Sequence, residues 1–145
     1  MTTSPQLSGL EIMRGIRDGE LPPAPIQRLL GFRLVEADPG RIAFVLTPRE
    51  DHYNPIGSVH GGIAATLLDS AMGAAVHTTR GAGQGYATLE MKVNLVRQVT
   101  VETGELRAEG HVVHGGSRVA TAEGRLTRVS DGALVAHGSS TCLLL

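Results

Sequence analysis

The chain has 145 residues, of which 41% are hydrophobic and 19% are charged, and its formal net charge is −1. This length and composition predict one globular domain with a core of ordinary size, and they exclude an intrinsically disordered chain. A nearly neutral chain is a poor match for nucleic acid or an anionic membrane surface as the main partner, because both attract basic faces.

Signals for export and membrane insertion are missing from the sequence. No apolar run reaches the roughly 18 residues that a membrane span needs. The N-terminal stretch MTTSPQLSGLEIMRG lacks the basic start and apolar core of a signal peptide. The single cysteine, Cys142, excludes an internal disulfide and is interpreted as a small buried hydrophobe in an apolar tail. Together these features favour a reducing, cytoplasmic setting without a membrane partner.

The first third of the chain combines short helices with turn signals. Apolar residues at Leu10, Met13 and Ile16 predict a helix over 7–18 with a narrow apolar stripe. The stretch GELPPAP interrupts the chain, and IQRLLG then predicts a short helical turn that ends at Gly31. FRLVEA and RIAFVLT flank the turn signal DPG, so residues 32–47 are expected to form a hairpin.

The rest of the chain predicts one long helix, over 60–79, followed by a meander of long strands. Gly-Gly and Asp-Gly pairs mark the turns of this meander. Such an order predicts an α+β domain in which an antiparallel sheet packs on the helix. We divide the chain into an N-terminal helical extension, 1–24, and a main domain, 25–145. The strands are expected at 86–98, 103–113, 117–128 and 133–144.

Asp69 belongs to a narrow polar stripe on the long helix when side chains are placed at about 100° per residue. A polar stripe usually faces solvent, and the alternative is that it faces a partner subunit or a cleft. Gly73 favours the second interpretation, because glycine inside a helix costs roughly 1 kcal/mol relative to alanine. Its missing side chain, one turn beyond Asp69, would leave room for a ligand. The stripe consists of Thr66, Asp69, Ser70, Gly73 and His77.

The helix begins at His60-Gly61-Gly62, a sequence that suits an anion site. The first turn of a helix has unpaired N–H groups and a partial positive charge. Glycines let a ligand atom approach those groups, as an oxyanion would require. A glycine-rich helix entry without a ligand is the common alternative, so the glycine pair alone is a weak signal.

The stretch NPIGSVHGGIAATLLD, with Asn54, His60, Gly61 and Asp69 at its spacing, resembles the motif of the PaaI-type hotdog-fold thioesterases. That family includes phenylacetyl-CoA thioesterase and acyl-CoA thioesterase 13-like proteins, and the resemblance runs from about residue 25 to the C-terminus. It implies a hotdog fold, in which an antiparallel sheet wraps a long central helix. It also implies homodimers or homotetramers, acyl-CoA thioesters as substrates, and no metal or redox cofactor.

The resemblance implies that an aryl or medium-chain acyl-CoA is hydrolysed to free acid and CoA at a dimer interface. Asp69 comes from one subunit, and Asn54 and the His-Gly-Gly segment come from the other. The Gly61 N–H binds the thioester oxygen, and Asp69 activates water or attacks the carbonyl to form a mixed anhydride. Asn54 orients the water or the thioester. His60 supports the carbonyl or the loop, or has only a structural role at the helix entry.

Further site residues are implied by the same resemblance. Thr88 matches a position that holds the attacking water, although threonine is also an ordinary strand residue. The segment HGGSRVA resembles a stretch near the CoA entrance, where phosphates would be bound. Arginine suits phosphate through its planar fork of donors, although most surface arginines have no specific role. The candidates for CoA binding are Arg97, Gly116, Ser117 and Arg118.

Two other functions on the same fold are alternatives to a thioesterase. An enoyl-CoA hydratase would carry an Asp-x-Asn-Pro-x-His dyad. Here Asp51 and Asn54 are one residue too far apart, and Ile56-Gly57 takes the place of the histidine. An acyl-CoA-binding module without catalysis is the second alternative, and the first 24 residues are too short and too rich in proline for an added DNA-binding helix-turn-helix. The sequence leaves the identity of the acyl group open.

Overall fold

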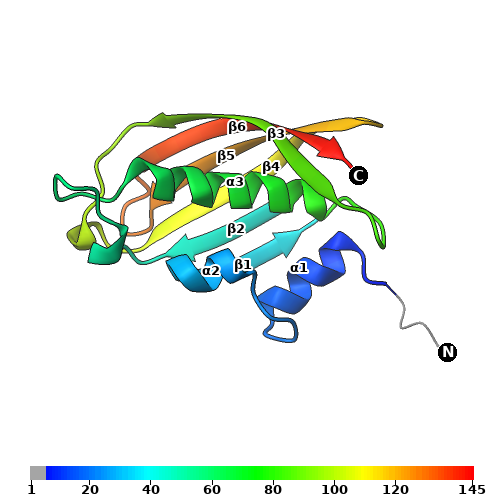
Figure 1. Ribbon diagram of the computed structural model, residues 1–145, viewed down its shortest axis with the longest axis horizontal. Coiled ribbons are helices and arrows are strands. Elements are labelled where there is room, and N and C mark those ends of the chain that lie inside the picture. The colour runs from blue at the N-terminus through cyan, green and yellow to red at the C-terminus, as the bar shows by residue number, and fades with distance from the viewer. Residues whose placement is uncertain (1–5) are drawn as a thin grey trace.

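The computed structural model describes residues 6–145, which form one curved antiparallel sheet with a long helix across its face (Figure 1). The long helix is α3, Gly61–His77, and two short helices, α1 (Gly9–Arg17) and α2 (Pro25–Leu30), lie beside the first strand. This arrangement confirms the expected α+β fold. The strands are β1 (Phe32–Asp38), β2 (Arg41–Leu46), β3 (Tyr86–Leu95), β4 (Leu106–Gly115), β5 (Val119–Arg128) and β6 (Leu134–Leu144).

The strands follow the order β1-β2-β4-β5-β6-β3, and each neighbouring pair is antiparallel. The predicted meander is correct for β4, β5 and β6 and wrong for β3, which pairs with β6 at the edge of the sheet. The reason is the connection from β3 to β4, residues 96–105, which is too long for a tight hairpin and contains a 3-10 turn at Val101–Thr103. That turn also delays the start of β4 from the expected residue 103 to Leu106.

The connection 96–105 passes the N-terminal end of α3. The N–H groups of Val96 and Arg97 both donate to the carbonyl of Val135, at 2.9 and 3.1 Å. The N–H of Val59, just before α3, donates to the carbonyl of Val99 at 2.8 Å. Figure 1 shows these loops gathered at the end where α3 begins, so loops surround the helix start and the sheet supports the rest of the helix.

Close contact between backbones fixes α3 on the sheet. Gly110, Gly124 and Gly138 stand in register on β4, β5 and β6. A Cβ on Gly110 would collide with the backbone carbonyl of Ala71 in α3, so only glycine fits this position. Small residues therefore set the helix-to-sheet distance, in keeping with an aromatic content of 3%. The fully buried aliphatic side chains around this contact include Leu67, Leu68, Met72 and Leu126.

Helix α1 lies within the stretch where a helix was predicted. Ser8 caps it: its hydroxyl accepts from the N–H of Glu11 at 3.3 Å, and the Glu11 carboxylate accepts from the N–H of Ser8 at 2.7 Å. The N–H of Gly9 donates to the carbonyl of Arg80 at 3.0 Å, just beyond the C-terminal end of α3. The start of α1 is thus anchored at that end of the molecule.

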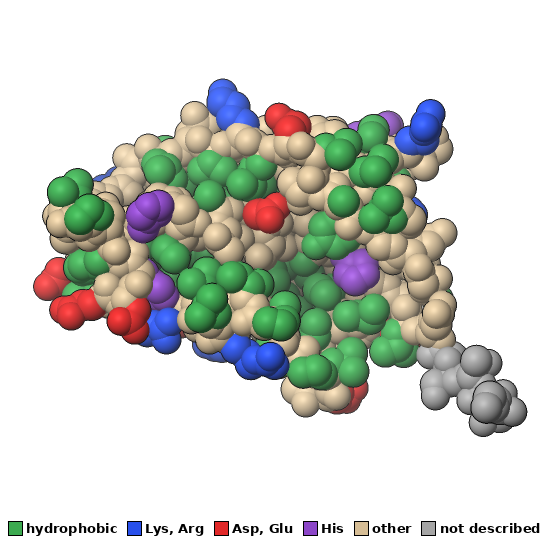
Figure 2. Space-filling view, in the orientation of Figure 1, with side chains coloured by type: hydrophobic (Ala, Val, Ile, Leu, Met, Phe, Trp, Pro, Cys, Tyr) green, Lys and Arg blue, Asp and Glu red, His purple; other side chains and the backbone are tan. Residues whose placement is uncertain are grey.

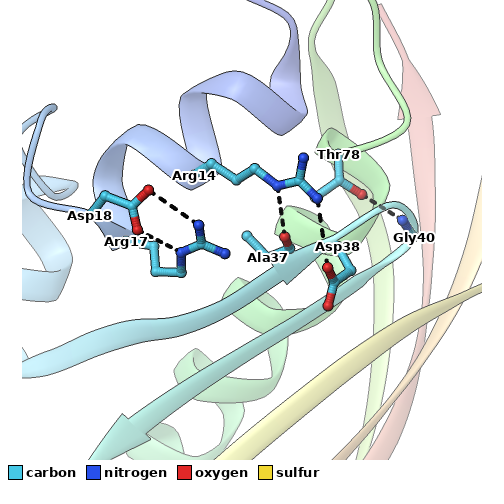
Figure 3. A network of polar contacts seen from close by, with 7 residues as sticks. All are labelled: Arg14, Arg17, Asp18, Ala37, Asp38, Gly40 and Thr78. Carbon is cyan, nitrogen blue, oxygen red and sulfur yellow. Dashed lines mark hydrogen bonds and ion pairs between the residues drawn. The ribbon is translucent and has the colours of Figure 1, made fainter.

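The β1–β2 turn joins α1 to α3 through polar contacts (Figure 3). Arg14 donates from Nε to the carbonyl of Ala37 at 3.1 Å, and its Nη2 lies 3.6 Å from the carboxylate of Asp38. On the other side of the turn, the Thr78 hydroxyl accepts from the N–H of Gly40 at 2.7 Å. The ion pair is mostly exposed and contributes little by itself. The carbonyl and hydroxyl contacts fix the position of the turn.

Candidate active site

Strand β3 of the same chain partly covers the polar stripe of α3. The sequence had suggested that the stripe faces solvent, or else a partner subunit or a cleft, and a strand of the same chain was not among these possibilities. Asp69 is half-buried, and the Thr88 hydroxyl of β3 donates to its Oδ1 at 2.9 Å. His77, at the end of the stripe, is half-buried with its ring centroid 5.5 Å from that of Tyr86. Burial, and secondarily the charge of Arg80, lower the pKa of His77. Thr88 thus lies where it can orient a water molecule beside the carboxylate.

Tyr86 occupies the room that Gly73 leaves, so the interpretation of this space as a ligand site is wrong. A Cβ on Gly73 would lie 2.7 Å from Cε2 and 2.9 Å from the hydroxyl of Tyr86. Burial, with a smaller effect of the nearby Asp69 carboxylate, raises the pKa of Tyr86 to about 12. Its hydroxyl is therefore a neutral hydrogen-bond donor near Asp69. The glycine inside the helix signalled a close contact, but the sequence did not indicate its partner.

The start of α3 presents a free backbone donor. His60 is the N-cap, and its Nδ1 accepts from the N–H of Gly62 at 2.9 Å. This assigns the proton of the neutral ring to Nε2 and confirms a structural role for His60 at the helix entry. The Gly61 N–H has no acceptor among the residues that the structure describes. It lies in the first turn, where the helix dipole favours negative charge.

The loop before α3 is organised by Asn54. Its Oδ1 accepts from the N–H groups of Ile56 and Ser58, at 3.0 and 3.2 Å. Its Nδ2 donates to the Ser58 hydroxyl at 3.0 Å, which leaves one amide hydrogen of Asn54 without a described partner. Most of the Asn54 amide is therefore used to shape the loop.

A second residue of this loop, His52, was passed over in the sequence. It is 3% exposed, and its Nδ1 accepts from the N–H of Arg49 at 3.0 Å. Its Nε2 then carries the proton and donates to the carbonyl of Leu30 at 2.8 Å, which ties the loop to α2. No motif or spacing pointed to this residue, because its partners are backbone groups distant in the sequence.

A cavity of about 270 Å³ opens beside the start of α3. Asn54, His60 and Gly61 lie on its wall, together with Arg97 from the connection between β3 and β4. The deeper wall is apolar and includes Leu126, which is fully buried. The structure thus brings together four of the residues predicted from sequence around one cavity with an apolar inner wall. Asp69 is not among the residues that line it.

The predicted CoA-binding residues divide between the two ends of the sheet. Arg97 is at the cavity. Gly116, Ser117 and Arg118 form the β4–β5 turn, and β4 runs about 30 Å from Leu106 at the cavity to that turn. The turn lies toward the Thr88 end, because Cys142 of β6 pairs with both Thr88 and Ala120. Within one chain, Arg97 and the turn cannot contact the same phosphate.

Gly61 and Asp69 are also too far apart to act on one carbonyl group within one chain. They are eight residues apart on α3, which corresponds to about 12 Å along the helix axis. Each chain therefore presents two separate sets of groups. We call Asn54, His60, Gly61 and the adjoining cavity the mouth half-site. We call Asp69 and Thr88, with Tyr86 beside them, the carboxylate half-site.

Among residues 6–145, no three His, Cys, Asp or Glu side chains are grouped so that they could hold a metal ion. Within the same residues, no helix combines the length and hydropathy that a bilayer crossing requires.

Comparisons with known proteins agree with this fold. The thioesterase superfamily profile matches residues 56–135, which include Gly61, Asp69 and Thr88. Acyl-coenzyme A thioesterase 13 of Homo sapiens is 32% identical over 117 residues, covering 79% of this chain and 81% of the relative. A phenylacetic acid degradation-related protein of Ralstonia eutropha is 26% identical with a TM-score of 0.81, covering 91% of this chain and 98% of that one.

The fold is shared more widely than the sequence. The PaaI protein of E. coli, from the phenylacetic acid degradation operon, is 18% identical, yet it superposes with a TM-score of 0.81 over 95% of this chain and 96% of its own. This likeness concerns the fold. Together with the profile match and the human relative, it shows that the chain belongs to the thioesterase superfamily, with a PaaI-type hotdog fold.

Proposed function

We propose that the protein hydrolyses acyl-CoA thioesters to free acid and CoA, in a site where the carboxylate half-site of one subunit meets the mouth half-site of another. The observation that carries this proposal is the separation of Asp69 from the free Gly61 amide by about 12 Å on one helix. In a pair of copies, the Asp69 carboxylate of one subunit lies beside the Gly61 amide of the other, so the separation within one chain is no obstacle. The human relative's name, acyl-coenzyme A thioesterase 13, supports the choice of substrate.

The Gly61 N–H binds the thioester oxygen and stabilises the negative charge that develops there. Removing one such donor typically costs about 2.7–4 kcal/mol of transition-state stabilisation. Asp69 of the other subunit takes a proton from water held by Thr88. The water oxygen adds to the carbonyl carbon, and the tetrahedral intermediate then expels the CoA sulfur, which leaves as the thiol.

Asp69 can instead attack the carbonyl carbon directly, forming a mixed anhydride that water later cleaves. The two routes differ in where the new oxygen goes. In a single turnover in ¹⁸O-labelled water, attack by water places the label in the acid product. Attack by Asp69 followed by hydrolysis at the aspartyl carbon leaves the label in Asp69.

Asn54 and His60 complete the mouth half-site. The remaining amide hydrogen of Asn54 donates to the water or to the thioester. His60 holds the first turn through its contact with Gly62 and presents its Nε2–H toward the carbonyl end of the substrate. Their main contribution is to keep the Gly61 N–H pointing at the place where the oxyanion forms.

The CoA phosphates are bound by Arg97 of the subunit that gives the mouth and by Gly116, Ser117 and Arg118 of the subunit that gives the carboxylate. This division follows from the opposite ends of the sheet on which the two groups lie. Exposed guanidinium groups such as Arg97 and Arg118 can grip phosphate oxygens in a bidentate way.

The subunits pair along β3 into a homodimer, which can pair again into a homotetramer. β3 is an edge strand with unpaired backbone groups on its outer side. Its side chains Leu89 and Leu95 are 57% and 59% exposed. Figure 2 looks onto the face that carries α3, where hydrophobic side chains gather and charged ones lie mainly around the rim. A second subunit would cover this apolar surface.

The remaining expectations complete the proposal. The protein acts in the cytoplasm, with the acyl-CoA substrate and further copies of itself as its partners. No metal or redox cofactor takes part, since a backbone amide stabilises the oxyanion and a carboxylate acts as the base. Residues 25–145 form the catalytic domain, and residues 1–24 are an N-terminal extension whose helix α1 lies beside β1.

A thiol-release assay tests the proposal. We expect wild-type protein to liberate free CoA from an acyl-CoA, as followed with a thiol-reactive dye. We expect Asp69→Asn to lower this rate about 10³-fold, while CoA binding, followed by calorimetry, is kept. Binding without thiol release by the wild type would instead identify an acyl-CoA-binding module.

A further inference from the structure

Strand β3 has two charged residues, Glu90 and Lys92, and they stand on either side of Met91. Met91 pairs with Ser140 of β6, which is 2% exposed, so it lies on the inner face of the sheet with α3. Because side chains alternate along a strand, Glu90 and Lys92 lie on the outer face, where both are exposed. The strand therefore displays one negative and one positive charge at equal distances from a single residue.

These two charges are not used inside the chain. Among residues 6–145, no ion pair includes Glu90 or Lys92. Strand β3 is also at the edge of the sheet, so the backbone groups along its outer side have no strand to pair with. A strand with a free edge and one unpaired charge of each sign is complementary to a second copy of itself running antiparallel.

We infer that a second copy of this chain docks on β3 with the two-fold axis at Met91, so that Glu90 of each subunit lies opposite Lys92 of the other. The inference rests on the proposed function, because it needs the homodimer along β3. It goes further by fixing the register of the two strands and by naming the side chains that select it.

The charges select this register over its neighbours. Two antiparallel copies that continue one sheet keep their inner faces on the same side, so the axis must pass through a residue and not between two. An axis at Glu90 places two carboxylates directly opposite each other, and an axis at Lys92 places two ammonium groups there. Like charges in directly opposite positions destabilise a sheet, and opposite charges stabilise it. Of these three registers, the one centred on Met91 gives each charge an opposite partner.

The same register brings the two half-sites together. A bulge gives β3 one extra residue, Leu89, relative to β6. When this bulge is counted as one position, Leu95 of one subunit comes opposite Tyr86 of the partner subunit. Leu95 reaches the mouth half-site, since its Cδ1 lies 2.6 Å from the place of a Cβ on Gly61. Tyr86 stands in the carboxylate half-site, so the register selected by charge also joins the mouth of one subunit to the carboxylate of the other.

Cysteine cross-linking tests the position of the axis. In an antiparallel ladder, directly opposite Cβ atoms are about 4.5–5.5 Å apart and diagonal ones about 7–8 Å, so directly opposite cysteines are the ones that form a disulfide. We expect Met91→Cys to give a covalent dimer on a non-reducing gel after mild oxidation. Glu90→Cys and Lys92→Cys should each fail to cross-link alone, yet cross-link when they are co-expressed. The wild type, whose Cys142 is buried, is the control.

Two results of this scan would overturn the inference. One is the absence of a covalent Met91→Cys dimer. The other is a cross-link of Glu90→Cys or of Lys92→Cys with itself, which would move the axis to that residue.

Charge reversal tests what selects the register. Glu90→Lys leaves two positive charges on β3 and Lys92→Glu leaves two negative ones, so each variant repels its own copy and attracts the other. With different affinity tags and co-expression, we expect more than about nine-tenths of the dimers to be mixed, against about half for two tagged wild-type chains. The double variant Glu90→Lys/Lys92→Glu restores the pattern and should pair with itself as the wild type does. A mixed fraction near one half would overturn the inference.

These measurements need no turnover, so they separate the inference from the proposed function. A covalent Met91→Cys dimer and preferential mixing, without thiol release by the wild type, would refute hydrolysis and keep the register. Thiol release by the wild type, with random mixing of the charge variants and no Met91→Cys dimer, would refute the register and keep hydrolysis.

Discussion

The two ends of α3 are packed in opposite ways. At the C-terminal half, Gly110 brings the backbone of β4 against Ala71, and the Thr78 hydroxyl accepts from Gly40 in the β1–β2 turn. At the N-terminal end, the Gly61 N–H has no partner in the described chain, and a cavity lies beside it. One helix is thus clamped at one end and open at the other.

The two ends of α3 thereby serve different tasks. The clamped end runs from about half a turn to about two and a half turns beyond Asp69. It therefore holds the carboxylate in a fixed position and Thr88 and Tyr86 in contact with the helix. The open end leaves space for a substrate that must enter and leave. Changes at the open end should affect activity, and changes at the clamped end should affect mainly stability.

The largest effect is expected at the open end, from Gly61→Pro. Proline lacks the N–H yet suits the first position of a helix, and His60, with φ −58° and ψ 135°, has a conformation allowed before proline. We expect kcat/KM to fall about 10²- to 10³-fold, the usual loss for one oxyanion donor. Steady-state thiol release measures it.

Gly61→Ala is the matched control for this change. It keeps the N–H and adds a Cβ that would lie 2.6 Å from Cδ1 of Leu95, an exposed side chain that can move aside. Its activity should fall much less than that of Gly61→Pro. Equal losses in both variants would assign the effect to crowding at the mouth, against a role for the amide.

At the clamped end, Gly110→Ala should lower the free energy of unfolding by about 3 kcal/mol, because the new methyl group meets backbone that cannot move away. Urea denaturation measures this. Gly85→Ala is the control, since a Cβ there meets nothing within 4 Å. If Gly110→Ala were as stable as the control, the helix would not be clamped.

A smaller effect is expected between the two ends, from Thr88→Val. The variant keeps the shape of the side chain and loses the hydroxyl that donates to Asp69. We expect kcat to fall about tenfold, in line with a hydrogen bond to a charged group at an exposed site. Thr88→Ser keeps the hydroxyl and should retain most of the rate. A serine variant as slow as valine would point to packing rather than the hydrogen bond.

The smallest expected effect is on how the free energy of unfolding depends on pH, through His77 at the clamped end. Burial lowers the pKa of His77 in the folded state, so the unfolded chain binds a proton first as the pH falls through about 6.5. The free energy of unfolding should therefore decrease as the solution is acidified below that value. Denaturation at pH 7 and pH 5 should show a smaller decrease in His77→Gln than in wild type. The exposed His114→Gln should behave as wild type; an identical decrease in all three would contradict this role of His77.

Much of the fold could be predicted because its signals are local. The DPG turn signal predicted the first hairpin. The Asp131-Gly132 pair predicted the last hairpin, and Gly132 has a φ of +73° there. The position of β3 could not be predicted, since the partner of an edge strand depends on a connection that crosses the sheet. The contact of Gly110 with α3 is likewise set by residues about forty positions apart in the chain.

The candidate residues of the site could be named from the sequence, but their arrangement could not. Asn54, His60, Gly61 and Asp69 became candidates because their spacing matches the family motif that the sequence resembles. A helix wheel gives the direction of Asp69 but not what covers it, and therefore missed Tyr86 above Gly73. The division into two half-sites was implied by the resemblance, and the position of Gly61 and Asp69 eight residues apart on α3 gives a geometric reason for it.

Mixed dimers test the central claim that the site is built from two chains. Asp69→Asn and Gly61→Pro subunits carrying different affinity tags are co-expressed, and the heterodimer is purified through both tags. One of its two sites then combines an intact Asp69 with an intact Gly61. We expect about half of the wild-type kcat, although each parent homodimer is nearly inactive. A heterodimer no more active than its parents would place Asp69 and Gly61 in the same chain's site and contradict the account.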